Sequence, residues 1–434
     1  MTSPERLTVR GPEDILGFIP HSLGYWPVNS LVAMTLQGKK LGATLRLDLP
    51  GPGVLAAPAA FAGTVRRYLE ADEHADGTLL ALFTNNGWLS GPGCYGGLLS
   101  GLQSALGEAG MPVKEAWYVG DSYWRDVGCV DPACCPLPGR PVQQIRDSLL
   151  STEMVYRGSS VGPPPDAQAL PVPVPDVHRA AVLAAEAEWA IQLDLRRRSR
   201  TQFDAVLRQW EAMIARRPED LGRLSVHRDA FLRATLLVPA WRDAVLVMAA
   251  AGTPAAAAGA EEFGIFGGDA GPGPLEPAAE DAGRGTVPTG SDAPGPPCFA
   301  MQNVDMQAID AHDVYGESMM KPGGKPEIAG YGDVLMGHVP AVPQWETLES
   351  LDIVLGHLAL FGGAPAAAAL TGRGWIAWCR GRGSYAAAYL GEALEIEPGY
   401  RLAELLLELV RRGGLCGWAA RKEAAWQKFG PDAA

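Results

Sequence analysis

The sequence predicts a mixed α/β sheet domain at the N-terminus, followed by an all-helical region that ends in a tetratricopeptide-like helix hairpin. Residues 1–160 alternate short apolar runs with amphipathic stripes, which indicates strands and helices in one domain. Residues 176–250 and 345–430 keep helical spacing, and residues 251–344 between them are rich in glycine, proline and alanine. We therefore expect an α/β domain, a helical segment, a linker and a C-terminal helical bundle.

The element order predicted for the first domain is β-β-α-β-α-β-β. Two runs separated by the turn Gln37–Lys40 predict a β-hairpin. A second hairpin is predicted where Gly120-Asp121 separates two aromatic runs, because such dipeptides form tight turns between antiparallel strands. Between the hairpins, apolar spacing predicts two helices around a buried strand. The expected strands are 31–36, 43–48, 78–83, 115–119 and 122–127, and the expected helices are 59–71 and 98–109.

The second half is predicted to be helical on both sides of the linker. In residues 251–300, 31 of fifty residues are Gly, Pro or Ala, so we expect a disordered acidic linker, with irregular sequence to about residue 344. The apolar stretch 353–370 contains His357 and a Gly-Gly-Ala-Pro break, which favours two short buried helices over a membrane span. The spacing of six residues resembles that of a tetratricopeptide helix hairpin; they are Gly374, Gly381, Ala386, Leu390, Ala393 and Pro398.

Composition narrows the classes of function. The 434 residues carry 36 basic and 49 acidic side chains, a net charge of −13, which disfavours bulk binding to nucleic acid. The first residues lack the basic and apolar segments of a signal peptide. Seven cysteines, an odd number, are typical of reduced thiols. We therefore expect a cytoplasmic protein that binds neither membrane nor bulk nucleic acid.

A cysteine and proline string, Cys129-Val130-Asp131-Pro132-Ala133-Cys134-Cys135-Pro136, follows the last predicted strand. The three thiols of Cys129, Cys134 and Cys135 could ligate a soft metal such as zinc, although paired C-x-x-C elements are absent. A fourth ligand would come from Cys94, His21, His74 or Asp131. Two alternatives stay open: a loop whose thiols pack inward, and a redox-active thiol.

Other candidate groups are scattered along the chain. Asp48, Asp121 and Asp126 lie at predicted strand ends, where paired carboxylates could transfer protons, but turn formation also explains them. A possible functional surface consists of Asp48, Asp121, Asp131 and Trp124 of the aromatic hairpin. The string Gly91–Gly96 has dinucleotide-loop spacing or is a plain glycine-rich loop. His21 and His357 lie among apolar residues and are expected to be hydrogen-bonded core residues.

Three stretches together resemble an actinobacterial family, the domain of unknown function numbered four-one-nine-two. They are Leu16–Val32, Arg46–Pro50 and Gly120–Pro136, and the segment Trp375–Ala403 is similar to that family's C-terminal helices. The resemblance implies no activity or cofactor. It places Ser30, the 46–50 stretch and the cysteines among the motif positions. The chain departs from the pattern at Ser122-Tyr123, where Gly-Arg or a similar pair is expected, and at Asn85-Asn86, where acidic residues are more usual.

The leading hypothesis is a cytoplasmic, non-enzymatic interaction or regulatory protein with a protein partner, in which the cysteine string is architectural. The alternative is a metal- or thiol-dependent enzyme centred on Cys129, Cys134 and Cys135, with zinc as the possible cofactor. A third hypothesis is nucleotide binding at Gly91–Gly96. Measuring bound metal separates the first two hypotheses.

Overall fold

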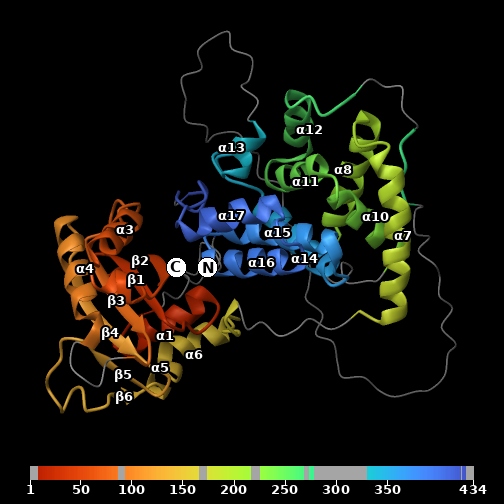
Figure 1. Ribbon diagram of the computed structural model, residues 1–434. Helices are drawn as coiled ribbons and strands as arrows, with labels where there is room; N and C mark the ends of the chain where they lie inside the picture. Colours follow the sequence, from red (N-terminus) through yellow and green to blue (C-terminus); the bar gives the residue numbers. More distant parts are fainter. Residues whose placement is uncertain are drawn as a thin grey trace, which may run out of the picture.

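The computed structural model describes residues 8–86, 93–165, 174–216, 225–267, 273–277, 330–421 and 423–426. Within these residues the chain forms a sheet with flanking helices and then a larger helical part (Figure 1). The sheet part is coloured red to yellow in Figure 1, and the helical part runs from yellow to blue. This arrangement confirms the predicted fold class.

The N-terminal part is built on one six-stranded sheet with the order β2-β1-β3-β4-β5-β6. Strands β3 and β4 pair in parallel, and every other neighbouring pair in this sheet is antiparallel. The predicted order β-β-α-β-α-β-β is therefore confirmed for the first five strands. The strands are β1 (Ser30–Gln37), β2 (Lys40–Asp48), β3 (Gly77–Phe83), β4 (Val113–Val119), β5 (Tyr123–Asp126) and β6 (Arg140–Pro141).

Helices cover both faces of the sheet. On one face α3 (Ala59–Leu69) and α4 (Gly96–Glu108) pack against a shared apolar core that includes Leu31 and Ala33 of β1. The alternate residues of β1, Val32 and Met34, enter a second core beneath α1 (Pro12–Leu23) and α5 (Gln143–Arg146). Helix α6 (Leu149–Tyr156) packs on α1, and α2 (Pro52–Leu55) is one turn. The period-two alternation of a strand distributes its side chains between these two layers.

Helices α1, α5 and α6 and strand β6 were not predicted from the sequence. Helix α1 carries Pro20 inside it, and a proline in a helix interior normally argues against a helix. Strand β6 has two residues, too few for any alternating pattern. Both α1 and β6 depend on tertiary contacts, because α1 buries Leu16 and Ile19 against the sheet and β6 pairs with β5.

The helical part shares one large apolar core. The predicted helical segment 176–250 is confirmed and contains α7 (Asp176–Asp194), α8 (Arg200–Ile214), α10 (Val226–Leu236) and α11 (Pro239–Ala251). The stretch 353–370 forms two buried helices that meet at a turn, as expected. The later helices are α13 (Tyr331–Leu335), α14 (Trp345–Ala359), α15 (Gly363–Cys379), α16 (Gly383–Ile396) and α17 (Arg401–Arg411), and α14 to α17 pack pairwise in succession.

The prediction of a linker over residues 251–344 is wrong at its beginning and at its end, where Tyr331–Leu335 form α13 and Val334 is fully buried. Residues Thr253–Glu262 form helix α12, whose Ala256 and Ala260 are fully buried, and the Tyr331 hydroxyl donates to the Ala256 carbonyl at 2.6 Å. Alanine has the highest helix propensity and a small side chain that lets α12 pack closely on α11. Counting alanine together with glycine and proline concealed this. The predicted linker residues 278–329 lie outside the described residues.

Among the described residues, no single helix is both long and apolar enough to cross a membrane. Helices α10 and α11 reach that composition only as a pair, and they are bent by 104° relative to each other. Most of their residues are buried in the helical core.

The two parts of the chain touch along β2, α3 and the later helices. Arg46 of β2 donates to the Ser384 hydroxyl of α16 at 3.0 Å, and the Tyr68 hydroxyl of α3 donates to the Gly413 carbonyl. The rings of Tyr25 and Tyr385 meet edge to face with centroids 5.6 Å apart. In Figure 1 the sheet part lies on the side of the helical part where α16 and α17 are labelled.

The tetratricopeptide-like positions make the contact between α15 and α16. Ala386, Leu390 and Ala393 are fully buried, and a Cβ added at Gly374 would lie 2.7 Å from Leu390 Cγ and 3.4 Å from the Ala386 carbonyl oxygen. The absence of a side chain at Gly374 therefore allows the two helices their close approach.

Replacing Gly374 by alanine is expected to destabilise the helical part by about 1–3 kcal/mol, because overpacking forces Leu390 or the helix to shift. Gly391 on α16 is the matched control, since a Cβ there meets nothing within 4 Å. Gly391→Ala should be neutral or stabilising by up to about 1 kcal/mol through helix propensity. Urea unfolding of both variants measures the difference, and equal effects would refute the packing account.

Candidate functional site

The cysteine string lies on the loop that leaves β5 at Asp126 and returns to the sheet at β6. At the first end of the loop, Oδ1 of Asp126 accepts the amide N–H groups of Gly128 at 2.8 Å and Cys129 at 2.7 Å. This carboxylate therefore fixes the backbone of Cys129 directly beyond the strand. Asp126 was considered as an acid–base candidate from the sequence, and its Oδ1 is instead occupied in holding the loop.

The middle of the loop is a turn that begins at Asp131. The Asp131 carbonyl accepts the amides of Cys134 at 3.2 Å and Cys135 at 2.7 Å, and its Oδ1 accepts the amide of Ala133 at 2.8 Å. Aspartate commonly closes such turns through its own side chain. The turn brings Cys134 and Cys135 back toward Cys129.

The three cysteine sulfurs converge at the loop. The Sγ atoms of Cys129, Cys134 and Cys135 all lie within 4.8 Å of one another. Tetrahedral zinc with Zn–S bonds of about 2.3 Å requires sulfurs about 3.8 Å apart, so small movements of the loop would complete a three-thiolate set. Cys135 is buried, Cys129 is half-buried and Cys134 is exposed. Inward packing, as the architectural hypothesis expected, describes Cys135 but not Cys134.

The surroundings of Cys135 keep its thiol protonated when no ion is bound. Burial raises the pKa of Cys135, and the neighbouring sulfurs of Cys129 and Cys134 raise it further. A hydrogen bond from the backbone of Asp126 lowers this pKa, by less than burial raises it. A metal ion binding here would displace the proton, since thiolates are the ligands of zinc.

Arg140 of β6 ties the loop to the rest of the domain. Its Nε donates to the Cys134 carbonyl at 2.8 Å, Nη2 lies 3.6 Å from Cys134 Sγ, and Nη1 pairs with Glu13 at 2.9 Å. Its guanidinium also lies 5.3 Å from the ring centre of Trp124, which is buried. The sequence analysis missed Arg140, although a basic residue five positions after Cys135 was the available signal.

The proposed sources of a fourth ligand lie apart from the three sulfurs or are occupied. His21 is buried against Ser151 and Ser159, with ring nitrogens 3.1 and 3.0 Å from their hydroxyls, which confirms it as a hydrogen-bonded core residue. Asp131 Oδ1 is engaged by Ala133, and His74 is exposed in the turn before β3. In the part of the chain that the structure describes, no His, Asp or Glu joins the three-cysteine group. The side chain of Cys94 lies outside that part.

The other candidate residues stay separate, and the inclusion of Trp124 in a possible functional surface is wrong, because its side chain is buried in the core of the sheet part. Asp48 is 82% exposed and pairs with Arg46 at 2.8 Å at the end of β2. Asp121, in the turn after β4, exchanges two hydrogen bonds with Asn85. These carboxylates share one end of the sheet, but β1 and β3 lie between their strands. Residues 91–92 of the glycine string lie outside the described residues.

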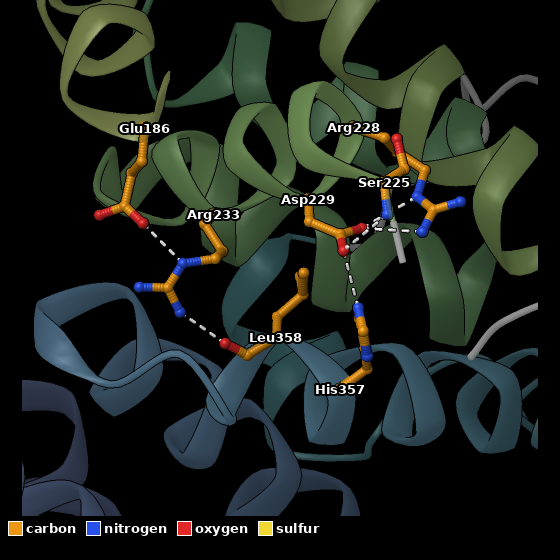
Figure 2. Close-up of polar contacts among 7 residues, drawn as sticks. All are labelled: Glu186, Ser225, Arg228, Asp229, Arg233, His357 and Leu358. Carbon is orange, nitrogen blue, oxygen red and sulfur yellow. Dashed lines mark hydrogen bonds and ion pairs between the residues drawn. The ribbon is translucent and has the colours of Figure 1, made fainter. Parts of the chain in front are cut away.

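A buried polar cluster in the helical part was not anticipated (Figure 2). Asp229 of α10 is fully buried, and its carboxylate lies 2.8 Å from Nε2 of His357 on α14 and 2.9 Å from Nη2 of Arg228. Burial raises the pKa of Asp229, but the hydrogen bond from His357 and the charge of Arg228 outweigh it, so this pKa lies below its ordinary value. The expectation that His357 is a hydrogen-bonded core residue is confirmed.

Arg233, one turn further along α10, binds the end of α14. It is fully buried, pairs with Glu186 of α7 at 2.6 Å, and donates to the carbonyls of Leu358 at 2.5 Å and Gly362 at 2.6 Å. The Leu358 carbonyl lies at the C-terminal end of α14, where cations are favourable, and the Gly362 carbonyl lies in the turn between α14 and α15. The cluster thus joins three helices and has the character of a structural clasp.

The fold and the site together define a class: a mixed α/β sheet domain with an exposed three-thiol loop, joined to a region of packed helix pairs. A family model described as a domain of unknown function, DUF4192, matches residues 12–261 and 353–414. The chain belongs to this family, which is the family its motifs resembled. Neither the curated proteins nor the solved structures contain a match to the chain.

Proposed function

We propose that this protein binds a thiophilic metal ion, zinc foremost, through Cys129, Cys134 and Cys135, and that the metal organises a loop used in a non-enzymatic interaction or regulatory role. The convergence of three free thiols within 4.8 Å carries the proposal. Three thiolates around a divalent ion leave one negative charge, and Arg140 holds a guanidinium nitrogen 3.6 Å from one of the sulfurs.

Disulfide formation explains the cluster less well. Cys134 and Cys135 are adjacent, and a bridge between neighbours is strained because their Cα atoms lie about 3.8 Å apart, below the usual bridging range. A bridge from Cys129 to either residue would leave the third thiol close to it without a role. A shared ion uses all three sulfurs at once.

The interaction role is supported by the apolar side chains on the same loop. Val130 is 94% exposed and Leu137 is 72% exposed, one on each side of the turn that carries Cys134 and Cys135. Their place on the same loop as the three thiols is what supports a protein partner for this loop. A cavity of about 310 Å³ lies elsewhere, between α8, α11 and α14, so the thiols are on a surface and not within that cavity.

The proposed compartment is the cytoplasm. The five cysteines whose side chains are described are free thiols, which supports a reducing environment. The net charge of −13 supports a partner other than nucleic acid.

Metal analysis of the protein purified without chelators tests the proposal. We expect about one zinc or comparable soft ion per chain, and Cys129→Ser or Cys135→Ser should reduce this several-fold, because each change removes one of the three thiolates that hold the ion. Cys298→Ser is the control that removes a thiol distant in sequence. Metal-free wild-type protein that stays metal-free in excess zinc would refute the proposal.

A second candidate is a thiol-dependent enzyme, favoured by the exposure of Cys134 beside Arg140. It requires a thiol that reacts rapidly with an alkylating reagent in the folded, metal-free protein. Peptide mapping after brief alkylation would identify Cys134 as that thiol. Reaction no faster than that of an unstructured cysteine peptide would argue against this candidate.

A further inference from the structure

The geometry of the loop indicates which kind of ligand completes the metal centre. We infer that the ion bound by Cys129, Cys134 and Cys135 keeps a fourth, exchangeable position that binds the thiolate of an external small thiol. This inference rests on the proposed metal function and adds the ligand class. Three protein ligands with one open position are typical of reactive zinc sites, whereas structural sites close with four.

The open position follows from how the three sulfurs are supplied. All three come from one short loop, and the described residues contribute no fourth His, Cys, Asp or Glu to their group. Asp126 and Asp131 accept backbone amides of the loop through Oδ1, and neither carboxylate belongs to the group of ligand atoms formed by the three sulfurs. A tetrahedral ion held by this set would therefore present one position to solvent.

The direction of the open position follows from burial. Cys135 is 5% exposed and faces the domain, Cys129 is intermediate, and Cys134 is exposed. An ion among these sulfurs is covered on the Cys135 side and accessible on the Cys134 side. An external ligand would approach from the exposed Cys134 side, close to the guanidinium of Arg140.

The class of ligand follows from the softness of the centre. A thiolate-rich site favours a further sulfur ligand over oxygen ligands. The guanidinium of Arg140, 3.6 Å from Cys134 Sγ, partly offsets the negative charge that another thiolate adds. On binding, the thiol gives its proton to solvent, the metal–water bond breaks and a metal–sulfur bond forms, so no oxidant or reductant is needed.

Cobalt substitution of the full-length protein tests the open position. Co(II) replaces zinc, and its visible absorption reports the number and type of ligands. We expect 2-mercaptoethanol to change this spectrum in one saturable step with one thiol per cobalt, and zinc X-ray absorption to rise from three sulfur ligands to four. Imidazole at the same concentration should give a smaller change.

Three outcomes would overturn the inference. They are a spectrum unaffected by the thiol, loss of cobalt to the thiol, and a spectrum already altered by Cys94→Ser or Asp131→Asn, which would identify a fourth ligand in the chain. Failure of the metal function itself looks different, because cobalt would then not bind with one-to-one stoichiometry at all. The two failures are thereby distinguished.

Discussion

Replacing Asp229 by alanine is expected to lower the free energy of unfolding of the helical part by about 3–5 kcal/mol. Asp229 is fully buried between Arg228 and His357, whose side chains are each 9% exposed. Removing the carboxylate leaves the buried Arg228 and His357 side chains without their shared acceptor. Keeping these groups buried and unpaired costs more free energy than an exposed ion pair contributes to stability. The clasp also joins α10 to α14, so the loss should be cooperative across the helical core (Figure 2).

The effect of Asp229 should depend on pH in a defined direction. Because the folded-state pKa of Asp229 lies below the unfolded value, about 3.9, its contribution is fully present above that value. The contribution is lost as the pH falls through the folded-state pKa. The stability difference between wild type and Asp229→Ala should therefore be constant near neutrality and shrink below about pH 4.

The chain contains a matched control for this prediction. Asp333 and His338 form an exposed aspartate–histidine pair, 3.6 Å apart, with both side chains 61% exposed. Asp333→Ala should cost about 0–1 kcal/mol. Urea unfolding of both variants across pH gives the comparison. Similar losses for Asp229→Ala and Asp333→Ala would show that the buried cluster does not hold the helices together.

Saturating zinc is expected to slow amide hydrogen exchange at Cys129 and Cys135. When the free zinc concentration is about 1,000 times the dissociation constant, exchange should be about 1,000-fold slower, which corresponds to a stabilisation of about 4 kcal/mol. Both amides are held within the loop, by Asp126 Oδ1 and by the Asp131 carbonyl. If opening the loop requires release of the ion, each opening event costs the binding free energy. Adding a chelator should restore fast exchange.

The location of the slowed amides tests the mechanism. Cys135→Ser should remove the zinc dependence, whereas Cys298→Ser should preserve it. Amides in the core of β3 should be unaffected by zinc, because opening of the sheet does not require release of the ion. Protection that rises equally in the loop and in the helical part would indicate nonspecific stabilisation, and zinc-independent exchange in the loop would contradict the metal centre.

The fold of the N-terminal part was largely predictable because its elements carry local signals. The turns at 37–40 and at Gly120-Asp121 set the two hairpins, and the register Ser30↔Asp48 and Val119↔Trp124 followed. Helix α1 was not predictable, because Pro20 masks its pattern and burial of Leu16 and Ile19 outweighs the local cost. Helix α12 was hidden in a composition that looks disordered, and packing on α11 decided its state.

The candidate site was predictable in its residues but not in its geometry. The spacing of Cys129, Cys134 and Cys135 marked the string, yet spacing cannot show whether sulfurs converge or diverge. The role of Arg140 depends on β6 pairing with β5, which returns the chain to the loop. The hydrogen bond between Asp229 and His357 connects residues 128 positions apart, and a contact of this kind produces no local pattern in the sequence.

The sequence alone determined the order of the first five strands of the sheet that it predicted, the helix hairpin at Gly374–Pro398 and the family to which the motifs point, because each depends on residues close together in the chain. The tertiary structure alone decided that three thiols face one another, that Cys134 remains at the surface, and that a buried carboxylate joins α10 to α14. Distances between side chains and their exposure to water are set by packing over the whole fold, and neither is encoded in any short segment.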